Sequence, residues 1–400
     1  MYERGYNVDR IINSIGQGGF FVEKFIEFNV VYDCGTDSDI KILKTKIDKC
    51  FAKNKKKEKI DLVFVSHLHR DHINGLPYLL DNYEVKQIVL PYLTDKEIQV
   101  DLLSFAISTD GLSSGDDDFL GTFIERPEEA LESKGYETKI VRVLSEEVSE
   151  DGGGEIYSPA ELLDHKEIKS GTKIYLGMHC WIYIPYNYNN KKYFSDLDNE
   201  FKSTSIKGMP DTYEKVKELY SKKTTKDEIK KVYGTVFKDK VNESSMILYS
   251  GESCDDLRHS GFYHHSYGRN FVSKFLREIY ALCGNVKNYC PYHNNERYIN
   301  NGCLYTGDYV INDESKWHEV KVRYKKVWRN IGLIQIPHHA SKHNFCDEIV
   351  KENCFFFFCA GIDNRHNHPH GVVLNSCMSY KKLLLWVNEE DRSELHFLIN

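Results

Sequence analysis

Three histidines and an aspartate lie within one short stretch of this chain, and these residue types at this spacing could bind metal. The stretch is Ser66-His67-Leu68-His69-Arg70-Asp71-His72. Burying so many ionisable groups is unfavourable without a compensating cation, whereas divalent metals accept imidazole nitrogens and carboxylates as ligands. In an extended chain His67 and His69 project to the same side, and a turn at Arg70 would bring Asp71 and His72 toward a second ion. The spacing therefore favours two metals over one.

A histidine-rich surface loop is the simplest alternative, because the chain contains 17 histidines. The flanking sequence disfavours it. The cluster directly follows the apolar run from Ile60 to Val65, which is typical of a buried strand, and Asn74-Gly75-Leu76-Pro77 closes it with a tight-turn pattern. We therefore expect the cluster to form a site at the carboxyl end of a strand.

Three later segments end in side chains of the same kind. The short apolar run from Gly302 to Tyr305 is followed by Thr306-Gly307-Asp308, and the run from Ile331 to Pro337 leads into His338-His339-Ala340-Ser341. A third segment, from Asn364 to His370, places His368 before a proline. An aspartate beside glycine is common in turns, but Asp308 follows a strand that lies between two candidate metal-binding segments.

The run His-x-His-x-Asp-His resembles the signature of the metallo-β-lactamase fold, a superfamily of mostly hydrolytic enzymes built as a four-layer αββα sandwich. Gly16-Gln17-Gly18-Gly19, Asp33 and His338-His339-Ala340-Ser341 are similar to parts of one subgroup, the ComEC-type DNA-internalisation competence nuclease-like domain, which has His-His-Gly-Ser at the last of these places. The likeness runs in order from about Ile11 to Ile399.

This resemblance implies a role for each candidate. Asp308 would bridge two divalent ions, Zn or Mn, and Asp71 would orient a shared water that the ions convert to an attacking hydroxide. Either His338 or His339 would bind metal while the other faces a phosphate oxygen, and His368 would be a ligand or a proton donor. The expected metal ligands are His67, His69, Asp71, His72, Asp308, His338 and His339, and the expected catalytic residues are Asp71, His338, His339 and His368.

One departure from the family pattern stands out. Many metallo-β-lactamase enzymes have a further histidine between the first motif and the bridging aspartate, and here His179 could supply it, although it precedes its strand and so lies at the wrong end. His368 could also complete the site. If this ligand is missing, one metal would be held weakly.

The resemblance predicts a single α+β domain over residues 1–400, with insertions at about 95–170, 187–240 and 251–301. The first insertion is acidic and reads as loop-rich, and the second is polar and rich in lysine. Trp181 to Pro185 is expected to be a strand that ends at the proline, and Leu384 to Trp386 and Leu395 to Ile399 a closing pair.

Composition limits the function. The net charge of -7 excludes a global basic field, so a nucleic acid would need a local patch such as the lysine-rich outer face expected for a helix within residues 38–59, with Lys53, Lys55, Lys56, Lys57 and Lys59. Such a face is most often only solvated. No membrane span or signal peptide is evident and the 11 cysteines suit a reducing compartment, so we expect a cytoplasmic protein.

Three functions fit these features. The first is a phosphodiesterase or nuclease acting on DNA, which could serve in repair, nucleotide turnover or antiphage defence. The second is a metallo-hydrolase of a small phosphodiester, lactone or thioester, and the third is a weakly active metal-bound interaction protein whose insertions bind a protein partner. A basic groove would favour the first, a closed apolar pocket the second, and insertions that cover the site the third.

Overall fold

The structure is a computed structural model, and it describes residues 8–52, 58–109, 112, 114–147, 155–176, 181–188, 194–237, 245–253, 264–265 and 300–399. Several predictions made above fall outside these residues. They concern His179, the lysines at 53–57 and most of the insertion expected at 251–301.

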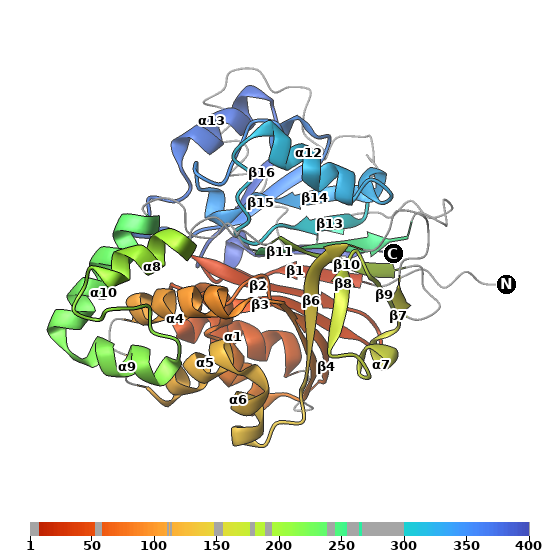
Figure 1. The fold of residues 1–400 in the computed structure, drawn as a ribbon. Coiled ribbons are helices and arrows are strands. Elements are labelled where there is room, and N and C mark those ends of the chain that lie inside the picture. Colours follow the sequence, from red (N-terminus) through yellow and green to blue (C-terminus); the bar gives the residue numbers. More distant parts are fainter. Residues whose placement is uncertain are drawn as a thin grey trace.

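Two mixed sheets form the centre of the molecule (Figure 1). In the first sheet the described strands lie in the order β12-β17-β1-β2-β3-β4-β5-β6-β8. Their bounds are β1 Val8–Ile12, β2 Gly18–Lys24, β3 Asn29–Thr36, β4 Ile60–Phe64, β5 Val85–Pro91, β6 Lys139–Glu147, β8 Glu167–Ser170, β12 His264–His265 and β17 Leu395–Ile399. Strands β1 to β3 pair antiparallel, whereas β3 to β6 and β8 run parallel.

The second sheet has the order β16-β15-β14-β13-β11-β10-β9-β7 among the described strands. Their bounds are β7 Ile156–Tyr157, β9 Lys173–Leu176, β10 Trp181–Tyr188, β11 Ser245–Glu252, β13 Gly302–Tyr305, β14 Ile331–Gln335, β15 Phe355–Cys359 and β16 Leu384–Val387. Strands β13 to β16 run parallel. In each sheet, the carboxyl ends of the parallel strands therefore lie along one edge.

Helices cover the outer face of each sheet (Figure 1). Against the first sheet lie α1 Ile40–Phe51, α3 Leu76–Asn82, α4 Asp95–Thr109, α5 Gly115–Glu125 and α6 Pro127–Lys134, and against the second lie α12 Glu314–Arg323 and α13 Gly371–Ser379. Helices α8 Phe194–Lys202, α9 Tyr213–Ser221 and α10 Lys223–Phe237 pack outside them, on α4, on α5 and on one another. Short helices are α2 Arg70–Ile73 and α7 Pro159–Leu162, with 3-10 turns η2 Trp328–Asn330, η3 His338–Ala340, η4 Ile349–Lys351 and η5 Asp391–Ser393.

Three apolar clusters hold these four layers together. In β4, Val63 packs toward the outer helices, whereas Leu62 and Phe64 pack between the two sheets. In β15, Phe357 lies between the sheets and Phe356 faces α12 and α13. Such strands read as continuous apolar runs because both of their faces are buried. The αββα sandwich predicted from the sequence is confirmed.

A buried ion pair of the first sheet accepts hydrogen bonds from the second sheet. Arg10 Nε of β1 donates to Glu23 Oε1 of β2 at 2.6 Å. Glu23 also accepts from Tyr183, Ser250 and Tyr305 of the second sheet, and although burial opposes its charge, Arg10 and these donors keep its pKa below the usual range. The pair ties the two sheets together by hydrogen bonds as well as by packing.

The first insertion is helical and not loop-rich, which corrects the sequence interpretation. The acidic run Asp116-Asp117-Asp118 forms the first turn of α5, where carboxylates favour the positive end of the helix dipole. Ser114 and Asp117 form a capping box at its start. The insertion also supplies β6 and β8 to the first sheet, so the predicted 95–170 range includes core strands.

Two strand predictions also differ from the structure. Pro185 does not end β10, which continues to Tyr188 because the next residues pair with β11. The two last strands are not a pair: β16 joins β15 in the second sheet, and β17 joins β1 in the first. Within the described residues, no helix has both the length and the apolar character needed to span a membrane.

Candidate metal centre

The histidine motif lies where β4 ends, as the sequence predicts. Residues 65–69 leave the strand and α2 begins at Arg70, so that Asp71 and His72 lie on a helical turn beside His67. The rings of His67 and His69 are 4.6 Å apart, and those of His67 and His72 are 4.1 Å apart. The motif therefore folds back so that the rings of His67, His69 and His72 lie close together.

Gly35 of β3 permits this turn to pack closely. A Cβ at Gly35 would come within 2.6 Å of the backbone of Asp71 and His72. Because backbone atoms cannot move aside easily, only glycine fits here, and the same strand can then carry Asp33 to the motif.

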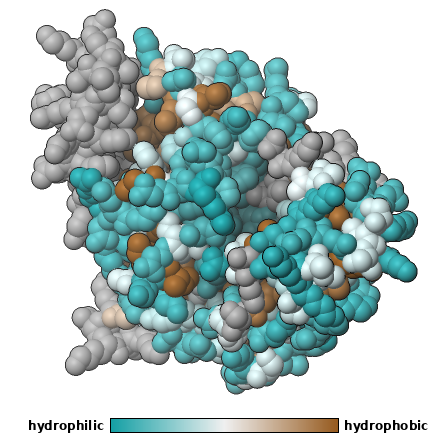
Figure 2. All heavy atoms as spheres, turned by 90° about the vertical axis from the view of Figure 1, so that its left-hand side faces the viewer, coloured by the Kyte–Doolittle hydropathy of each residue, from teal (hydrophilic) through white to brown (hydrophobic). Residues whose placement is uncertain are grey.

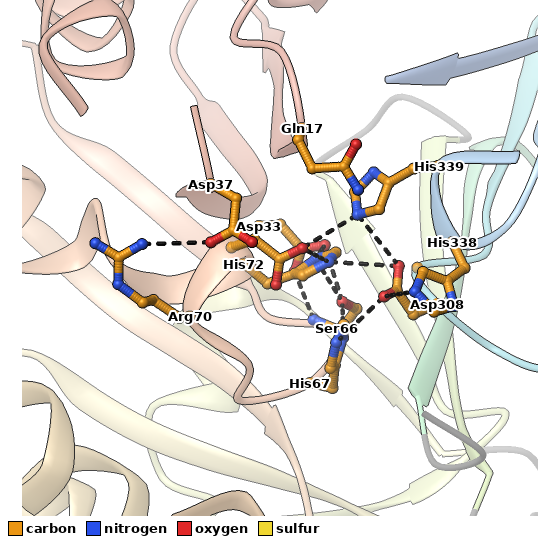
Figure 3. A network of polar contacts seen from close by, with 12 residues as sticks. Gln17, Asp33, Asp37, Ser66, His67, Arg70, His72, Asp308, His338 and His339 are labelled. Carbon is orange, nitrogen blue, oxygen red and sulfur yellow. Dashed lines mark hydrogen bonds and ion pairs between the residues drawn. The ribbon is translucent and has the colours of Figure 1, made fainter. Parts of the chain in front are cut away.

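Asp308 lies at the centre of the site, delivered by the turn after β13 (Figure 3). Its Oδ1 is 3.4 Å from His72 Nε2 and 3.9 Å from His339 Nε2. Its Oδ2 is 3.7 Å from both His67 Nε2 and His338 Nε2. One oxygen thus faces one pair of imidazoles and the other oxygen faces a second pair.

Hydrogen bonds on the outside fix the orientation of all four rings, and Figure 3 shows the partners Asp33 and Ser66. His72 Nδ1 lies 2.7 Å from Asp33 Oδ2, and His339 Nδ1 lies 2.7 Å from the carbonyl of Cys359. His338 Nδ1 is 2.8 Å from Asn344 Oδ1, and His67 Nδ1 is 2.9 Å from Ser66 Oγ, which itself donates to Asp33. Because carbonyl and carboxylate oxygens only accept, Nδ1 carries the proton and Nε2 is left as a ligand atom facing inward.

The inward atoms form a group that fits a metal ion. One ligand atom each of Asp71, His72, Asp308 and His339 lies within 4.8 Å of the others. Among the described residues, the buried Nε2 atoms of His67 and His72 have no hydrogen-bond partner. Buried nitrogens without a partner are costly, and a cation accepting their lone pairs would remove that cost.

Charges in the site oppose one another strongly. Burial disfavours ionisation of His72, but the carboxylates of Asp33, Asp71 and Asp308 outweigh it and raise the pKa of His72 well above its usual value. The pKa of His67 falls well below the ordinary value because of burial and the neighbouring His72. The carboxylates of Asp71 and Asp308 among buried imidazoles form a donor set suited to a divalent cation.

His338 and His339 occupy an unusual backbone segment. Both residues and Ala340 have positive φ angles of 49°, 54° and 64°. This left-handed turn directs both imidazoles toward Asp308, and His338 stays 24% exposed while His339 is buried. The sequence left open which of the two binds metal. The structure brings both to the site, with His339 in the four-residue group.

His368 lies at the edge of the same cluster. Its ring is 5.4 Å from that of His338 and 6.0 Å from that of His339, and its Nδ1 is 3.2 Å from Gln17 Nε2. Burial and the neighbouring histidines lower its pKa. Gln17 comes from the glycine-rich segment before β2, so that segment supports the site and does not cradle a phosphate.

Asp101 was missed by the sequence interpretation. It lies on α4 with its Oδ1 3.7 Å from His69 Nε2, and burial beside Glu97 raises its pKa to about 8. Nothing in the local sequence marks it, because it is 30 residues or so from the motif and lies within a helix without a distinctive pattern. Only the packing of α4 against α2 brings it to the site.

The described part of the lysine-rich patch does not lie next to the site. Lys59 directly precedes β4 and pairs with Glu84, whereas the motif follows the other end of β4. Five strand residues span roughly 16 Å, so Lys59 lies at the opposite edge of the sheet.

Comparison with protein-family models agrees with the fold over part of the chain. Residues 25–160 match the family model described as the metallo-beta-lactamase superfamily. A crystal structure of unliganded yeast PDE1 is similar at 10% sequence identity and a TM-score of 0.41, covering 98% of this chain and 100% of that one. No curated protein matches this chain.

The family match contains the histidine motif and Asp101, whereas Asp308, His338 and His339 lie beyond it and are joined to the motif by the fold. The αββα layers and the His/Asp cluster at the strand ends are consistent with that match. Over residues 25–160, about a third of its length, the chain is therefore similar to the metallo-beta-lactamase superfamily, and its two sheets with their covering helices form the sandwich fold expected for that superfamily.

Proposed function

We propose that this protein is a metal-dependent phosphodiesterase, most specifically a nuclease acting on DNA, which uses two divalent ions such as Zn or Mn. The position of Asp308 carries the proposal. Each oxygen of its carboxylate faces a different pair of inward Nε2 atoms, as a bridging carboxylate would require. His72, His339 and Asp71 lie on one side of it, and His67 and His338 on the other.

Bound at these positions, a pair of divalent ions would lower the pKa of a shared water and stabilise negative charge on the substrate. The protein's own groups would complete the chemistry. Asp71 Oδ2 is 3.1 Å from His339 Nε2 and can hold and orient the attacking water, while His368, whose ring lies 5.4 Å from that of His338, can protonate a leaving oxygen.

Cationic side chains beside the site favour a phosphate over an uncharged acyl group. Arg70 and Arg365 both pair with Asp37, at 3.3 and 3.6 Å, next to Asp71. Arg365 is 69% exposed and begins the loop that carries His366, His368 and His370. Guanidinium and imidazole groups bind phosphate oxygens well, so this loop would hold the backbone of a nucleic acid.

The face drawn in Figure 2 is mainly hydrophilic, with small separate hydrophobic patches. The likeness of the glycine-rich and His-His-Ala-Ser segments to the ComEC-type domain favours DNA over a small apolar ester. The same proposal includes a role in DNA processing or defence and a contact between the lysine-rich segment 53–59 and a long DNA substrate.

The test is hydrolysis of labelled single-stranded DNA, double-stranded DNA, RNA, bis(p-nitrophenyl) phosphate, a lactone and a thioester, with Mn²⁺ or Zn²⁺. We expect turnover of DNA and the aryl phosphodiester, and its loss in a His69→Ala/Asp71→Ala variant. An Asp164→Ala/His165→Ala variant is the matched control, because these adjacent residues lie after α7, outside the cluster. Turnover of only the lactone or thioester would identify an acyl hydrolase, and no turnover with either metal would refute an enzymatic role.

A further inference from the structure

Among the polar contacts of the site histidines, two sets differ in distance, while His339 Nε2 to Asp71 Oδ2 at 3.1 Å and His72 Nδ1 to Ser66 Oγ at 3.3 Å lie between them. Contacts from Nδ1 to the outer partners of His67, His72, His338 and His339 are 2.7–2.9 Å, as expected for hydrogen bonds. Contacts from Nε2 of the same rings to Asp308 are 3.4–3.9 Å. With metal–ligand distances of about 2.0–2.2 Å, two ligands of a tetrahedral ion lie roughly 3.3–3.6 Å apart. The longer class therefore suits two ligands that share an ion.

The contact between His69 and Asp101 belongs to the longer class. It joins His69 Nε2 to Asp101 Oδ1 at 3.7 Å, the same separation as His67 Nε2 to Asp308 Oδ2. An outer partner that merely orients His69 would be expected near 2.8 Å, as Asp33 is to His72. The distance therefore favours a shared cation over a direct hydrogen bond.

Charge and burial point the same way. The side chains of His69 and Asp101 are only 13% and 16% exposed, and in the described residues Asp101 has no ion pair with a lysine or arginine. His67 Nε2, whose ring lies 4.6 Å from that of His69, is buried and has no hydrogen-bond partner among the described residues.

We propose that Asp101 is a metal ligand, which completes the ion site of His67, His69 and Asp308 from the helical insertion. The two imidazole nitrogens and two carboxylate oxygens that these residues supply suit zinc or manganese. Asp101 thus occupies the place of the additional histidine that the family pattern would lead one to expect.

This ligand would couple the insertion to metal binding. Helix α4 packs against α5, α9 and α10 and touches α2, which carries Asp71 and His72. An ion held by both His69 and Asp101 would join α4 to the motif, and so would stabilise the insertion beside the site. The inference concerns the metal centre on which the proposed function rests, but its test measures binding, so it can fail while hydrolysis is still observed.

The direct test replaces Asp101 by cysteine and loads the protein with Co²⁺. A thiolate bound to cobalt produces a charge-transfer band in the near ultraviolet, which carboxylates do not. We expect this band in Asp101→Cys after subtraction of the wild-type spectrum, because the chain has 11 native cysteines. Ser104→Cys, on the same helix within one turn, is the matched control and should give no band. Cobalt bound to Asp101→Cys without the band would overturn the proposal.

The second test measures Zn²⁺ affinity and stoichiometry by calorimetry and elemental analysis. Asp101→Asn keeps the shape of the side chain, and we expect it to weaken one of two bound ions by at least about 10-fold while the other is unchanged. His69→Ala should weaken the same ion, and the double variant should bind little worse than either single variant. Wild-type affinity for both ions in Asp101→Asn would also refute the role of Asp101.

Discussion

Substitution of Asp33 by asparagine tests how the site is positioned. Asp33 is fully buried, and its carboxylate accepts from Ser66 N at 2.7 Å, Ser66 Oγ at 2.8 Å and His72 Nδ1 at 2.7 Å. It touches no inward ligand atom, so it can act only through the rings that it holds. An asparagine keeps one acceptor oxygen but directs an NH₂ group at these donors.

The expected cost is a loss of metal affinity. Removing an outer partner of a metal-bound histidine typically weakens binding about 10–100-fold, or ~1.4–2.7 kcal/mol. Asp33 serves two rings, His72 directly and His67 through Ser66, so we expect a loss near the upper end of that range. Turnover at saturating metal should recover in part, because the ligands themselves are intact.

The assay is a chelator competition titration with Zn²⁺ on wild-type and variant protein. Asp37→Asn is the matched control, since Asp37 is a half-buried carboxylate nearby that contacts Arg70 and Arg365 but no ring of the cluster by hydrogen bond. Unchanged affinity in Asp33→Asn, or an equal loss in Asp37→Asn, would refute the argument that Asp33 orients the ligands.

Three further predictions concern stability. Glu23→Ala should lower the free energy of unfolding by about 3–5 kcal/mol, because it removes the carboxylate that pairs with the buried Arg10 and leaves backbone carbonyls such as those of Ser250 and Asn301 as acceptors; a loss below about 1 kcal/mol in urea titrations would contradict this. Burial opposes charge on His396, but Asp9 and Glu394 outweigh it and raise its pKa to about 9. Because this folded-state pKa exceeds about 6.5 in the unfolded chain, the contribution of His396 to stability is complete below about pH 6.5 and is lost as pH rises through about 9. Discounted for the partial exposure of the side chain, this contribution is about 1–2 kcal/mol, and His396→Gln should flatten this part of the dependence of stability on pH. Zn²⁺ at about 100 times its Kd should stabilise the fold by ~2.7 kcal/mol per site and raise Tm, EDTA should reverse the rise, and an unchanged Tm would argue against binding to the native state.

The parts of the fold that could be predicted are those with local signals. The apolar run 60–65 followed by histidines identified β4 and the motif, because a strand buried on both faces and a cluster of ionisable groups are both visible in a few residues. Asp308 and His339 could be proposed for the same reason: each follows a short apolar strand. That these strands end at one edge of two stacked sheets came from the resemblance to a known fold.

The parts that could not be predicted depend on contacts across the chain. Asp101 reaches His69 only through the packing of α4, and Asn344 holds the ring of His338 from a loop without a distinctive pattern. The acidic run at 116–118 was misinterpreted for a different reason. Three aspartates look like a solvated loop until the capping box with Ser114 shows them to be a helix start, a signal that was present in the sequence.

Anomalous X-ray scattering from crystals of the protein grown with Zn²⁺ would show directly whether two ions bind on either side of Asp308. We expect two peaks on either side of the Asp308 carboxylate, one beside Asp71, His72 and His339 and the other between His67 and His69. The absence of any peak within bonding distance of Asp308 in zinc-saturated protein would contradict this expectation.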